Sequence, residues 1–309
     1  MTLNQLRAFL VSVRTGSFTA AAIELQMAQA SVSELIRRME DEYGLPLFTR
    51  GGRRLLLTAA GAELLPFAEQ AVASVDHGGQ ALRSLRSLGG GVATLGVMRN
   101  ADYYLLSDLV QQFHERYPNV RVRLIGQNSV QVAAGVANGE IEAGIVVLPV
   151  NDAGLKVTPL WQDEVYYASS NPDHLKHPMT TAHLGAARLI LYDAHYGWSD
   201  PTRRQLAERA RLAGVKLEAM IEVEQVEAAL RLVALGVGDT IICGAVAASV
   251  ACPANVGTVP FADRLYDTIA FVERESGSLS PATRELARLA RKMLHSDPRL
   301  KPVAGRAEI

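Results

Sequence analysis

The sequence predicts an α/β protein of two domains, in which a small helical domain precedes a larger domain of alternating strands and helices. Its 309 residues are enough for about two domains of ordinary size. Over roughly the first 40 positions, apolar residues recur at helical spacing. From residue 92 onward, short apolar runs alternate with amphipathic segments, which is typical of an α/β domain.

The composition is that of an ordinary globular chain without an overall charge bias. Apolar residues make up 49% and charged residues 20% of the chain. The formal net charge is -1, so a partner with a phosphate backbone must be met by a local patch. No lysine precedes Lys156, and the arginines before it are suited to bidentate contacts with phosphates and bases. The chain has only two cysteines and no visible export signal, which predicts a cytoplasmic protein. It has no long apolar run, which predicts that it does not span a membrane.

Three short helices are predicted before Gly44. The first begins near Leu3 and stops at Thr15-Gly16-Ser17, and the second runs from Phe18 to Leu25. Residues 26–28 connect the second helix to a third, which ends near Gly44, and so short a connection is typical of a helix-turn-helix. The residues expected to fill its core are Leu25, Met27 and Val32.

A basic β-hairpin is predicted after the third helix. Two apolar runs, residues 45–48 and 55–57, flank the sequence Arg50-Gly51-Gly52-Arg53-Arg54, and a Gly-Gly pair between such runs is typical of a hairpin turn. A helix-turn-helix followed by a basic hairpin is a winged variant. Its third helix would enter the major groove of double-stranded DNA, while the hairpin would follow the backbone or the minor groove.

This N-terminal segment resembles that of the LysR-type transcriptional regulators. The segments that carry the resemblance are LNQLRAFLVSVRTGSFTAAAIELQMAQASVSELIRRMEDEYGLPLFTR and GGRRLLLTAAGAELL. The resemblance implies an all-α winged helix-turn-helix DNA-binding domain over residues 1–58. The family often has Pro where Ala30 stands and Arg where Glu34 stands. The resemblance therefore implies the fold of this domain but not which bases it contacts.

The residues expected to face DNA lie on the third helix and on the hairpin. Gln29 can bond adenine and Glu34 can accept from cytosine N4, whereas Ser33 and Arg37 suit phosphate oxygens. The full predicted set is Gln29, Ala30, Ser33, Glu34, Arg37, Arg50, Arg53 and Arg54. The alternative is that Glu34, Arg37 and Arg38 form a solvated face of ion pairs three and four residues apart, and that the hairpin arginines are ordinary turn charges.

A long helix is predicted from Thr58 to about Leu88. Its apolar residues are spaced four and three apart, as in a coiled-coil seam, and they are Leu64, Ala68, Ala71, Val75, Gly78, Leu82 and Leu85. Gly78-Gly79 is expected to interrupt or bend it. The seam predicts a homodimer through a linker helix and hinge over residues 59–90, and the resemblance implies a homotetramer on an inverted-repeat operator. The alternative is that the helix packs on its own domain.

Residues 91–295 are predicted to form an effector-binding domain. The segments FHERYPNVRVRL, GEIEAGIVV and LVALGVGDTIIC resemble the effector domain of the same family, which implies a two-lobed periplasmic-binding-protein-like (type 2) fold. The first lobe would comprise residues 91–163 and 267–295, and the second lobe residues 164–266. Residues 296–309 are expected to be a loose tail.

A small-molecule site is predicted between the lobes, where strands end beside helix N-termini. The residues expected to line it are Arg99, Asn100, Asn128, Ser129, Leu148, Trp198, Gln225, Val226 and Cys243. Arg99, a cation on a strand-end loop, predicts that the effector is a small organic anion. Asn128, Ser129 and Ser199 are also expected to cap helices, and Trp198 would either stack on a ring of the effector or pack.

Other functions have weaker support in the sequence. No nucleophile, phosphate-binding or dinucleotide motif is present, which predicts that the chain is not an enzyme and needs no cofactor. His174 and His177 lack the further ligands that a metal site needs. One alternative is redox sensing through Cys243 and Cys252, which requires an exposed thiol of low pKa. The other is a solute-binding or enzymatic protein on the same fold, against which the helix-turn-helix argues.

Overall fold

The computed structural model describes residues 1–49, 55–84, 90–104 and 106–303. The chain divides into two compact units: Met1–Arg83 with Asn138–Glu140, and Ser84–Ala137 with Ile141–Ile309. Within the described residues, no helix combines the length and the apolar character that crossing a membrane requires.

The first unit begins with the three helices that the sequence predicted. They are α1 (Leu3–Thr15), α2 (Phe18–Glu24) and α3 (Gln29–Tyr43). The side chains of Thr2 and Ser17 accept hydrogen bonds from the first turns of α1 and α2. Gly16 and Gly44 end α1 and α3 in the left-handed conformation, at φ 67° and 68°.

The core of this unit follows the predicted pattern with one exception. Val32 is fully buried, and Leu25 packs against the same cluster. The prediction for Met27 was wrong, because its side chain is 40% exposed. Met27 follows Gln26, which adopts a left-handed conformation at φ 54° in the turn between α2 and α3.

The predicted hairpin is present and is anchored on the helices. It pairs β1 (Phe48–Thr49) with β2 (Leu56–Leu57), with Phe48 opposite Leu57. The ring of Phe48 packs against those of Phe9 and Phe18, with ring centroids 5.5 and 5.6 Å apart. The arginines predicted to contact DNA from this hairpin, Arg50, Arg53 and Arg54, lie outside the described residues.

Helix α4 (Ala59–Ser84) begins where Thr58 ties the hairpin to it. The Thr58 hydroxyl donates to the carbonyl oxygen of Pro46, at 2.6 Å, and accepts from the N–H of Gly61, at 3.1 Å. The helix continues through Gly78 and Gly79, so the predicted interruption was wrong. A pair of glycines lowers helix propensity, but the twenty-six residues of α4 include enough regular turns around them to keep the helix continuous.

The predicted seam of α4 is divided between two environments. Ala68 is fully buried against the core of the first unit, and Leu64 and Ala71 pack beside it. One turn further on, Val75 is 51% exposed, and Gly78 is exposed as well. The side chains of Leu82 and Leu85 are outside the described set. The first half of the seam therefore packs on its own domain, as in the alternative, whereas Val75 and Gly78 beyond it are exposed.

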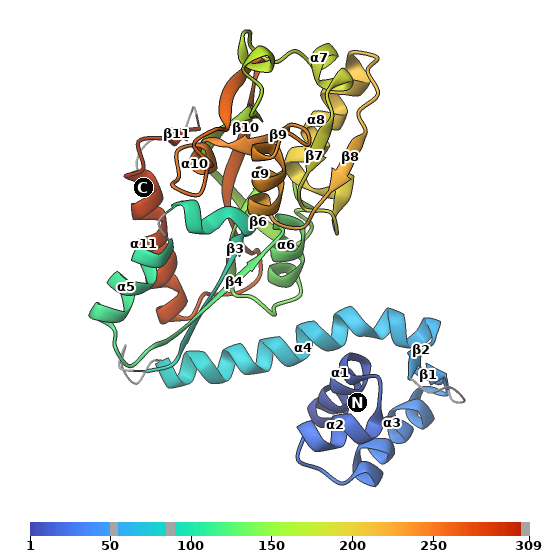
Figure 1. Ribbon diagram of the computed structural model, residues 1–309. Helices are drawn as coiled ribbons and strands as arrows, with labels where there is room; N and C mark the ends of the chain where they lie inside the picture. Colours follow the sequence, from blue (N-terminus) through green and yellow to red (C-terminus); the bar gives the residue numbers. More distant parts are fainter. Residues whose placement is uncertain (50–54, 85–89, 105, 304–309) are drawn as a thin grey trace. The chain divides into compact units, whose positions relative to one another are not determined.

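The second unit is organised by one sheet of seven strands. Its order is β11-β6-β10-β5-β3-β4, with β9 beside β6. The first lobe carries β3 (Val92–Met98), β4 (Arg121–Gln127), β5 (Ala143–Leu148), α5 (Leu106–Arg116), α6 (Ser129–Ala137) and α11 (Pro281–His295). In this lobe β3 pairs in parallel with β4 and β5, and α5 and α11 lie together over the sheet (Figure 1).

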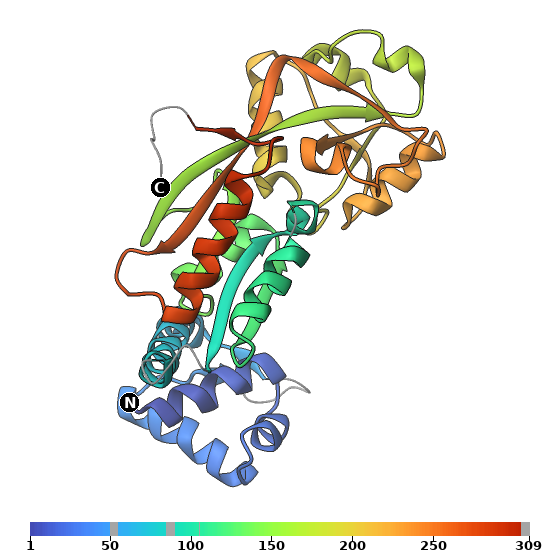
Figure 2. The same ribbon diagram turned by 90° about the vertical axis from the view of Figure 1, so that its left-hand side faces the viewer.

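The second lobe is built between two long strands. These are β6 (Leu155–Ser169) and β10 (Gly257–Arg274), which pair antiparallel over most of their length and pass from one lobe to the other (Figure 2). The lobe's other helices and strands are α7 (Thr181–Ala186), β7 (Leu189–Leu191), α8 (Pro201–Leu212), β8 (Ala219–Glu222), α9 (Val226–Ala234), β9 (Thr240–Cys243) and α10 (Gly244–Ala247). The second lobe also has two short 3-10 turns, η2 (Pro172–Leu175) and η3 (Gly197–Ser199). A third such turn, η1 (Arg99–Tyr104), follows β3 in the first lobe.

The tail that the sequence predicted to be loose is packed over its first part. Leu300 is 7% exposed, and Lys301–Pro302 forms β11 at the edge of β6. The guanidinium of Arg299 donates to the carbonyl oxygen of Tyr103, at 3.0 Å, and pairs with Asp297. These long-range contacts explain why polar, proline-containing residues are ordered here.

We expect Gly61→Ala to lower the stability of the first unit. A Cβ at this position would overlap the carbonyl oxygen of Leu47 and would lie 2.7 Å from Leu57 Cδ2. Such crowding costs about 1–3 kcal/mol, although alanine favours a helix more than glycine does. Urea denaturation measures the effect, with the exposed Ala62→Ser as the control, whose cost should stay near 0.5 kcal/mol. Equal stability of Gly61→Ala and the wild type would contradict this packing.

Candidate functional site

The N-terminus of α3 is exposed and open to an anion. Its N-cap is Ala28, which has no side-chain acceptor for the first N–H groups of the helix. Gln29 and Ala30 in the first turn are exposed, and Ser33 is half-buried one turn later. Helix N-termini of this kind attract phosphate groups through free N–H donors and the helix dipole.

Four charged residues of α3 are paired with one another, and they are Glu34, Arg37, Arg38 and Asp41. The Glu34 carboxylate accepts from Arg37 Nε, at 2.9 Å, from Arg37 Nη2, at 3.0 Å, and from Arg38 Nε, at 2.8 Å. These bonds lower the pKa of Glu34 to about 2. The pairs are those of the solvated-face alternative, so a contact of Glu34 or Arg37 with DNA must exchange one of them for a base or a phosphate.

The second candidate site is a cleft between the two lobes of the second unit. The first lobe contributes η1 and the start of α6, the second lobe contributes the loop after β7 and the start of α8, and β9 and β10 contribute one residue each. Of the nine residues that the sequence assigned to this cleft, the structure brings five together, and they are Arg99, Asn100, Asn128, Ser129 and Cys243.

The other four residues of the predicted set do not line this cavity. Val226 is 2% exposed within the apolar core. Gln225 precedes α9 without a side-chain capping bond, and the backbone oxygen of Leu148 accepts from Gln205 at 3.5 Å. Trp198 lies under the guanidinium of Arg203, 4.8 Å from the ring centroid. The side chains of Val226 and Trp198 therefore pack in this arrangement.

Sequence reasoning missed the acidic residues of the cleft. Asp193, Asp200 and Asp267 all line the cavity, each at most 8% exposed, together with Tyr104, Tyr192 and Thr202. A signal was present for two of them. Asp200 precedes Pro201, as an N-cap residue often does, and its carboxylate caps α8. Asp267 lies near the start of the run of residues 265–272, which is apolar apart from Asp267 and Thr268, and a charge in such a run needs a reason.

Arg99 is already paired across the cleft. Its Nε donates to Asp193 Oδ1, at 2.7 Å, and its Nη2 lies 2.7 Å from Glu224 Oε1. Both acidic partners come from the second lobe, whereas Arg99 directly follows the first strand of the first lobe. Asp193 adopts a left-handed conformation at φ 61°, which a residue other than glycine rarely does, and such strain is typical of functional sites. Arg99 therefore locks the lobes together and offers no free cation.

Asn128 forms a second polar bridge between the lobes. Its Nδ2 donates to Asp200 Oδ2, at 2.9 Å, while its Oδ1 accepts from the N–H of Val130 and so caps α6 as expected. The capping predicted for Ser129 and Ser199 was wrong. The hydroxyl of Ser129 instead accepts from the N–H of Val147 on β5, at 2.9 Å, and Asp200 takes the capping position of α8.

The carboxyl groups of the cleft repel one another. Asp163 on β6 and Asp267 on β10 are cross-strand partners, a position in which like charges are unfavourable. Burial raises the pKa of Asp267 to about 8, and the nearby Asp200 and Asp163 add to the shift. Burial, and then Asp193, raises the pKa of Asp200 to about 6. The cavity among these groups has a volume of about 30 Å³, room for about one water molecule.

Comparison with known proteins decides the family of this chain. Residues 3–62 match the family described as "Bacterial regulatory helix-turn-helix protein, lysR family", and residues 86–294 match the "LysR substrate binding domain". The chain belongs to the LysR family of transcriptional regulators. The resemblance that the sequence predicted is thereby confirmed, and it covers both compact units.

Relatives of this chain are named as transcriptional regulators. YbhD of Escherichia coli (strain K12), an "Uncharacterized HTH-type transcriptional regulator", is 26% identical over 282 residues, which cover 91% of this LysR chain and 88% of YbhD. A "Probable RuBisCO transcriptional regulator" of Synechocystis sp. is 34% identical over 167 residues, 53% of this chain and 48% of that protein. The match to the RuBisCO regulators thus spans about half of their length.

Solved structures confirm the fold class. A full-length OxyR variant from Pseudomonas aeruginosa has a TM-score of 0.70 at 20% identity and covers 100% of this LysR chain and 99% of its own. Full-length CbnR, solved in complex with its target DNA, has a TM-score of 0.65 at 21% identity and covers 95% of this chain and 100% of its own. At these identities the likeness shows the fold alone.

The cysteines of this LysR chain lack the features of a redox pair. Burial raises the pKa of the Cys243 thiol well above its ordinary value, and Cys243 is 3% exposed at the end of β9. Cys252 is half-buried, and burial raises its pKa as well. A reactive thiol needs exposure and a lowered pKa, so the geometry gives the redox alternative no support.

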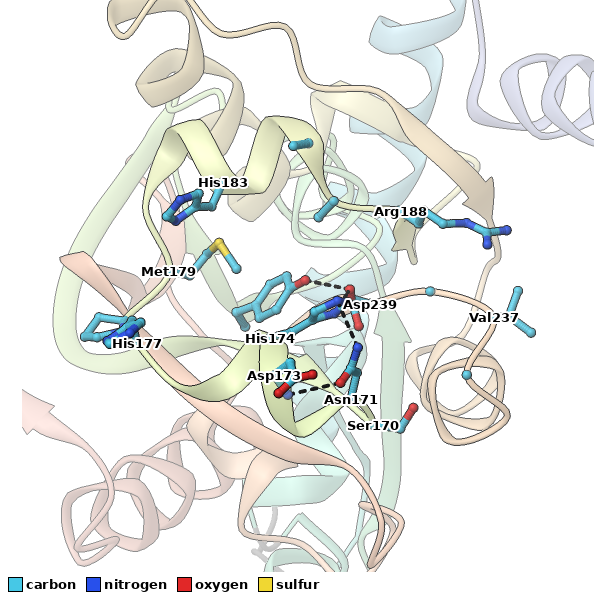
Figure 3. A pocket seen from close by; sticks show the side chains of 16 residues that line it. Ser170, Asn171, Asp173, His174, His177, Met179, His183, Arg188, Val237 and Asp239 are labelled. Atoms are coloured by element: carbon cyan, nitrogen blue, oxygen red, sulfur yellow. Dashed lines mark hydrogen bonds and ion pairs between the residues drawn. The ribbon is translucent and has the colours of Figure 1, made fainter.

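A larger pocket, of about 580 Å³, lies within the second lobe (Figure 3). Among its lining residues, Asp239 accepts from the Tyr167 hydroxyl, at 2.6 Å, and bonds His174 Nδ1, at 2.9 Å. His174 Nε2 in turn lies 3.1 Å from Asn171 Nδ2, so these polar groups satisfy one another. Across the described parts of the chain, no group of three or more histidine, cysteine or acidic side chains has an arrangement that could hold a metal ion.

The buried Asp267 predicts a specific dependence of stability on pH. Its folded-state pKa of about 8 lies above the ordinary 3.8, so between about pH 4 and 8 the unfolded chain gives up the proton that the folded chain keeps. The contribution of Asp267 to the free energy of unfolding is therefore greatest below pH 4 and is lost as the pH rises to 8. Asp267→Asn should flatten this decline and raise Tm at pH 8 by about 3 °C or more.

The control for this pH experiment is Asp263→Asn on the same strand, because the side chain of Asp263 is 91% exposed. Thermal unfolding is followed at several pH values for the wild type and both variants. Identical pH profiles of wild type and Asp267→Asn would show that Asp267 is ionised in the folded protein like an ordinary carboxyl.

Proposed function

We propose that this LysR regulator binds an inverted-repeat DNA operator through α3 and the hairpin, as a dimer joined by α4, and that a small molecule in the interlobe cleft controls it. The observation that carries the proposal is the exposed, uncapped start of α3, with Gln29 and Ala30 in its first turn. Phosphates are attracted to such a terminus, while neighbouring side chains meet the bases. Binding of CbnR to its target DNA supports the same partner here.

The cleft supports control by a small molecule because polar bridges hold its two sides together. Arg99 reaches Asp193 and Glu224, and Asn128 reaches Asp200, all across the gap. With room for about one water among these groups, a ligand enters only by breaking or replacing some of the bridges. Such a ligand shifts the balance between lobe arrangements and, through them, the arrangement of subunits on DNA.

The sequence predicted an organic anion as the effector, on the strength of Arg99. The geometry weakens that prediction, because Arg99 is neutralised by two carboxylates, and an acid would have to compete with both. The redox alternative lacks an exposed thiol of low pKa. We therefore retain a small-molecule effector, but the presence of Arg99 does not make it an anion.

We expect Gln29→Ala to weaken binding to the cognate operator by about 1–3 kcal/mol and to relax the base preference, because a bidentate contact with adenine is lost. Operator sequences come from genome-wide mapping of bound sites, and affinities from fluorescence anisotropy at fixed salt. Gln112→Ala, an exposed glutamine of α5, is the control and should leave affinity unchanged. Unchanged specificity of Gln29→Ala would mean that α3 does not read bases at this position.

The second half of the α4 seam is the surface that we propose joins two subunits. Val75 is half exposed, and charge at such a position is costly once a second helix covers it. Val75→Asp should shift the protein toward monomers at micromolar concentration in sedimentation velocity. Ser74→Asp adds the same charge at a neighbouring exposed position outside the seam and should leave the mass unchanged. Dimers of equal stability in both variants would contradict the seam.

A further inference from the structure

We propose that the effector of this cleft carries a cationic nitrogen, an ammonium or guanidinium group, which binds between Asp267 and Asp200. This inference rests on the proposed function of the cleft as the effector site. It replaces the predicted organic anion by a ligand of opposite charge, and it follows from the side chains that line the cavity.

The lining of the cavity has an excess of acid. It includes the carboxyl groups of Asp193, Asp200 and Asp267 and a single basic side chain, that of Arg99. Asp193 and Glu224, which both pair with Arg99, together carry one more charge than it does. Asp200 and Asp267 therefore remain without a cation inside the cavity.

The nearest other cations make their ion pairs outside the cavity. Arg203, in the first turn of α8, pairs with Glu222 and donates to the carbonyl oxygen of Tyr192, at 3.3 Å, and it does not line the cavity. Arg299 approaches Asp163 from the C-terminal segment, but its guanidinium is paired with Asp297. The charge of Arg203 lowers the pKa of Asp200, whereas neither arginine is among the groups that shift the pKa of Asp267.

Asp267 has an oxygen ready for a ligand. Thr202 and Gln205 both donate to its Oδ1, at 2.8 and 3.4 Å, which leaves Oδ2 without a partner in the described part of the chain. The residue is only 5% exposed, so bulk water does not serve this oxygen freely. A buried acceptor of this kind is costly unless a donor reaches it, and an ammonium or guanidinium is a charged donor of the right kind.

The other groups that face Asp267 add to the preference for a cation. Asp163 lies opposite it on β6, Asp200 faces it from the start of α8, and the neutral Tyr104, Tyr192 and Cys243 complete the surroundings. An anion placed here would be the third or fourth negative group in a small buried space. A cation would relieve the repulsion that now exists among these carboxyls.

Binding of a cation would be coupled to release of a proton. With a pKa near 8, Asp267 is mostly neutral at pH 7, and a bound ammonium favours its ionised form. Cation affinity should therefore rise roughly tenfold per pH unit between about pH 6 and pH 8, with up to about one proton released per site at pH 7. An anionic ligand would show the opposite sign, taking up protons and binding more tightly at lower pH.

The test is calorimetry on the full-length protein with size-matched probes of opposite charge. They are butane-1,4-diamine against butanedioate, ethanolamine against glycolate, and methylguanidine against acetate. Titrations at pH 6, 7 and 8, in pairs of buffers with different ionisation enthalpies, give affinity and proton release. We expect binding of at least one amine, one per cleft, with the pH dependence given above.

Two variants of the cleft test whether the carboxyls are responsible. Asp267→Asn should weaken amine binding at least tenfold at pH 8 and remove most of its pH dependence. Asp200→Asn should weaken it as well while keeping a good N-cap for α8, so it serves if Asp267→Asn fails to fold. Asp263→Asn, exposed on the same strand, should bind amines like the wild type.

Three results would overturn the inference: binding of the acids alone, binding of no amine, or amine binding that neither cleft variant weakens. Operator affinity, measured on the same samples, separates this inference from the proposed function. An acid that changes operator affinity while no amine binds would leave the regulator intact and overturn the cationic ligand. An amine that binds as expected without changing operator affinity would support the cation site and contradict its role in control.

Discussion

The antiparallel pairing of β6 with β10 is the constraint on which the rest of the second unit depends. The two strands run through both lobes and pair along most of their length, so this ladder joins the lobes covalently and by hydrogen bonds (Figure 2). The same ladder sets Asp163 opposite Asp267 at the cleft. The connection of the lobes and the charge of the site between them therefore have one structural origin.

The cleft combines buried carboxyl groups with polar bridges between the lobes. Tyr104 donates to Asp163, at 2.5 Å, and Thr202 donates to Asp267, so hydroxyl groups reduce the cost of burying these carboxyls without neutralising them. Arg99 and Asn128 then connect the lobes through ion pairs and hydrogen bonds, in addition to apolar contacts between them. Such bridges are individually modest in free energy, so a ligand that supplies alternative partners can change the lobe arrangement.

Much of the fold follows from local sequence patterns, whereas the character of the site does not. The helices before Gly44, the hairpin at Phe48 and the strand at Val92 are all set by periodicity and turn residues. Arg99 was correctly placed at the cleft, because a strand-end position is local information. Its partner Asp193 lies 94 residues further along the chain, and no pattern near Arg99 indicates that pairing. The register that sets Asp163 against Asp267 is likewise a property of two distant strands.

The same distinction applies to α4. Its heptad spacing predicted an apolar seam, but spacing alone does not say which partner covers each turn. Ala68 is covered by the core of its own unit, whereas Val75 is left exposed. Local propensity was equally insufficient at the C-terminal end, where Leu300 and β11 are held by contacts with residues far away in sequence.

Buried, mutually repelling carboxyls define this cleft. NMR can observe their ionisation directly. Full-length protein with 13C-labelled aspartate carboxyls is titrated by NMR from pH 3 to pH 9, and the resonance of Asp267 is assigned by its absence from Asp267→Asn. The account predicts a resonance that titrates near pH 8 and shifts to lower pH when a bound amine is present. Titration of every aspartate below about pH 5 would contradict it.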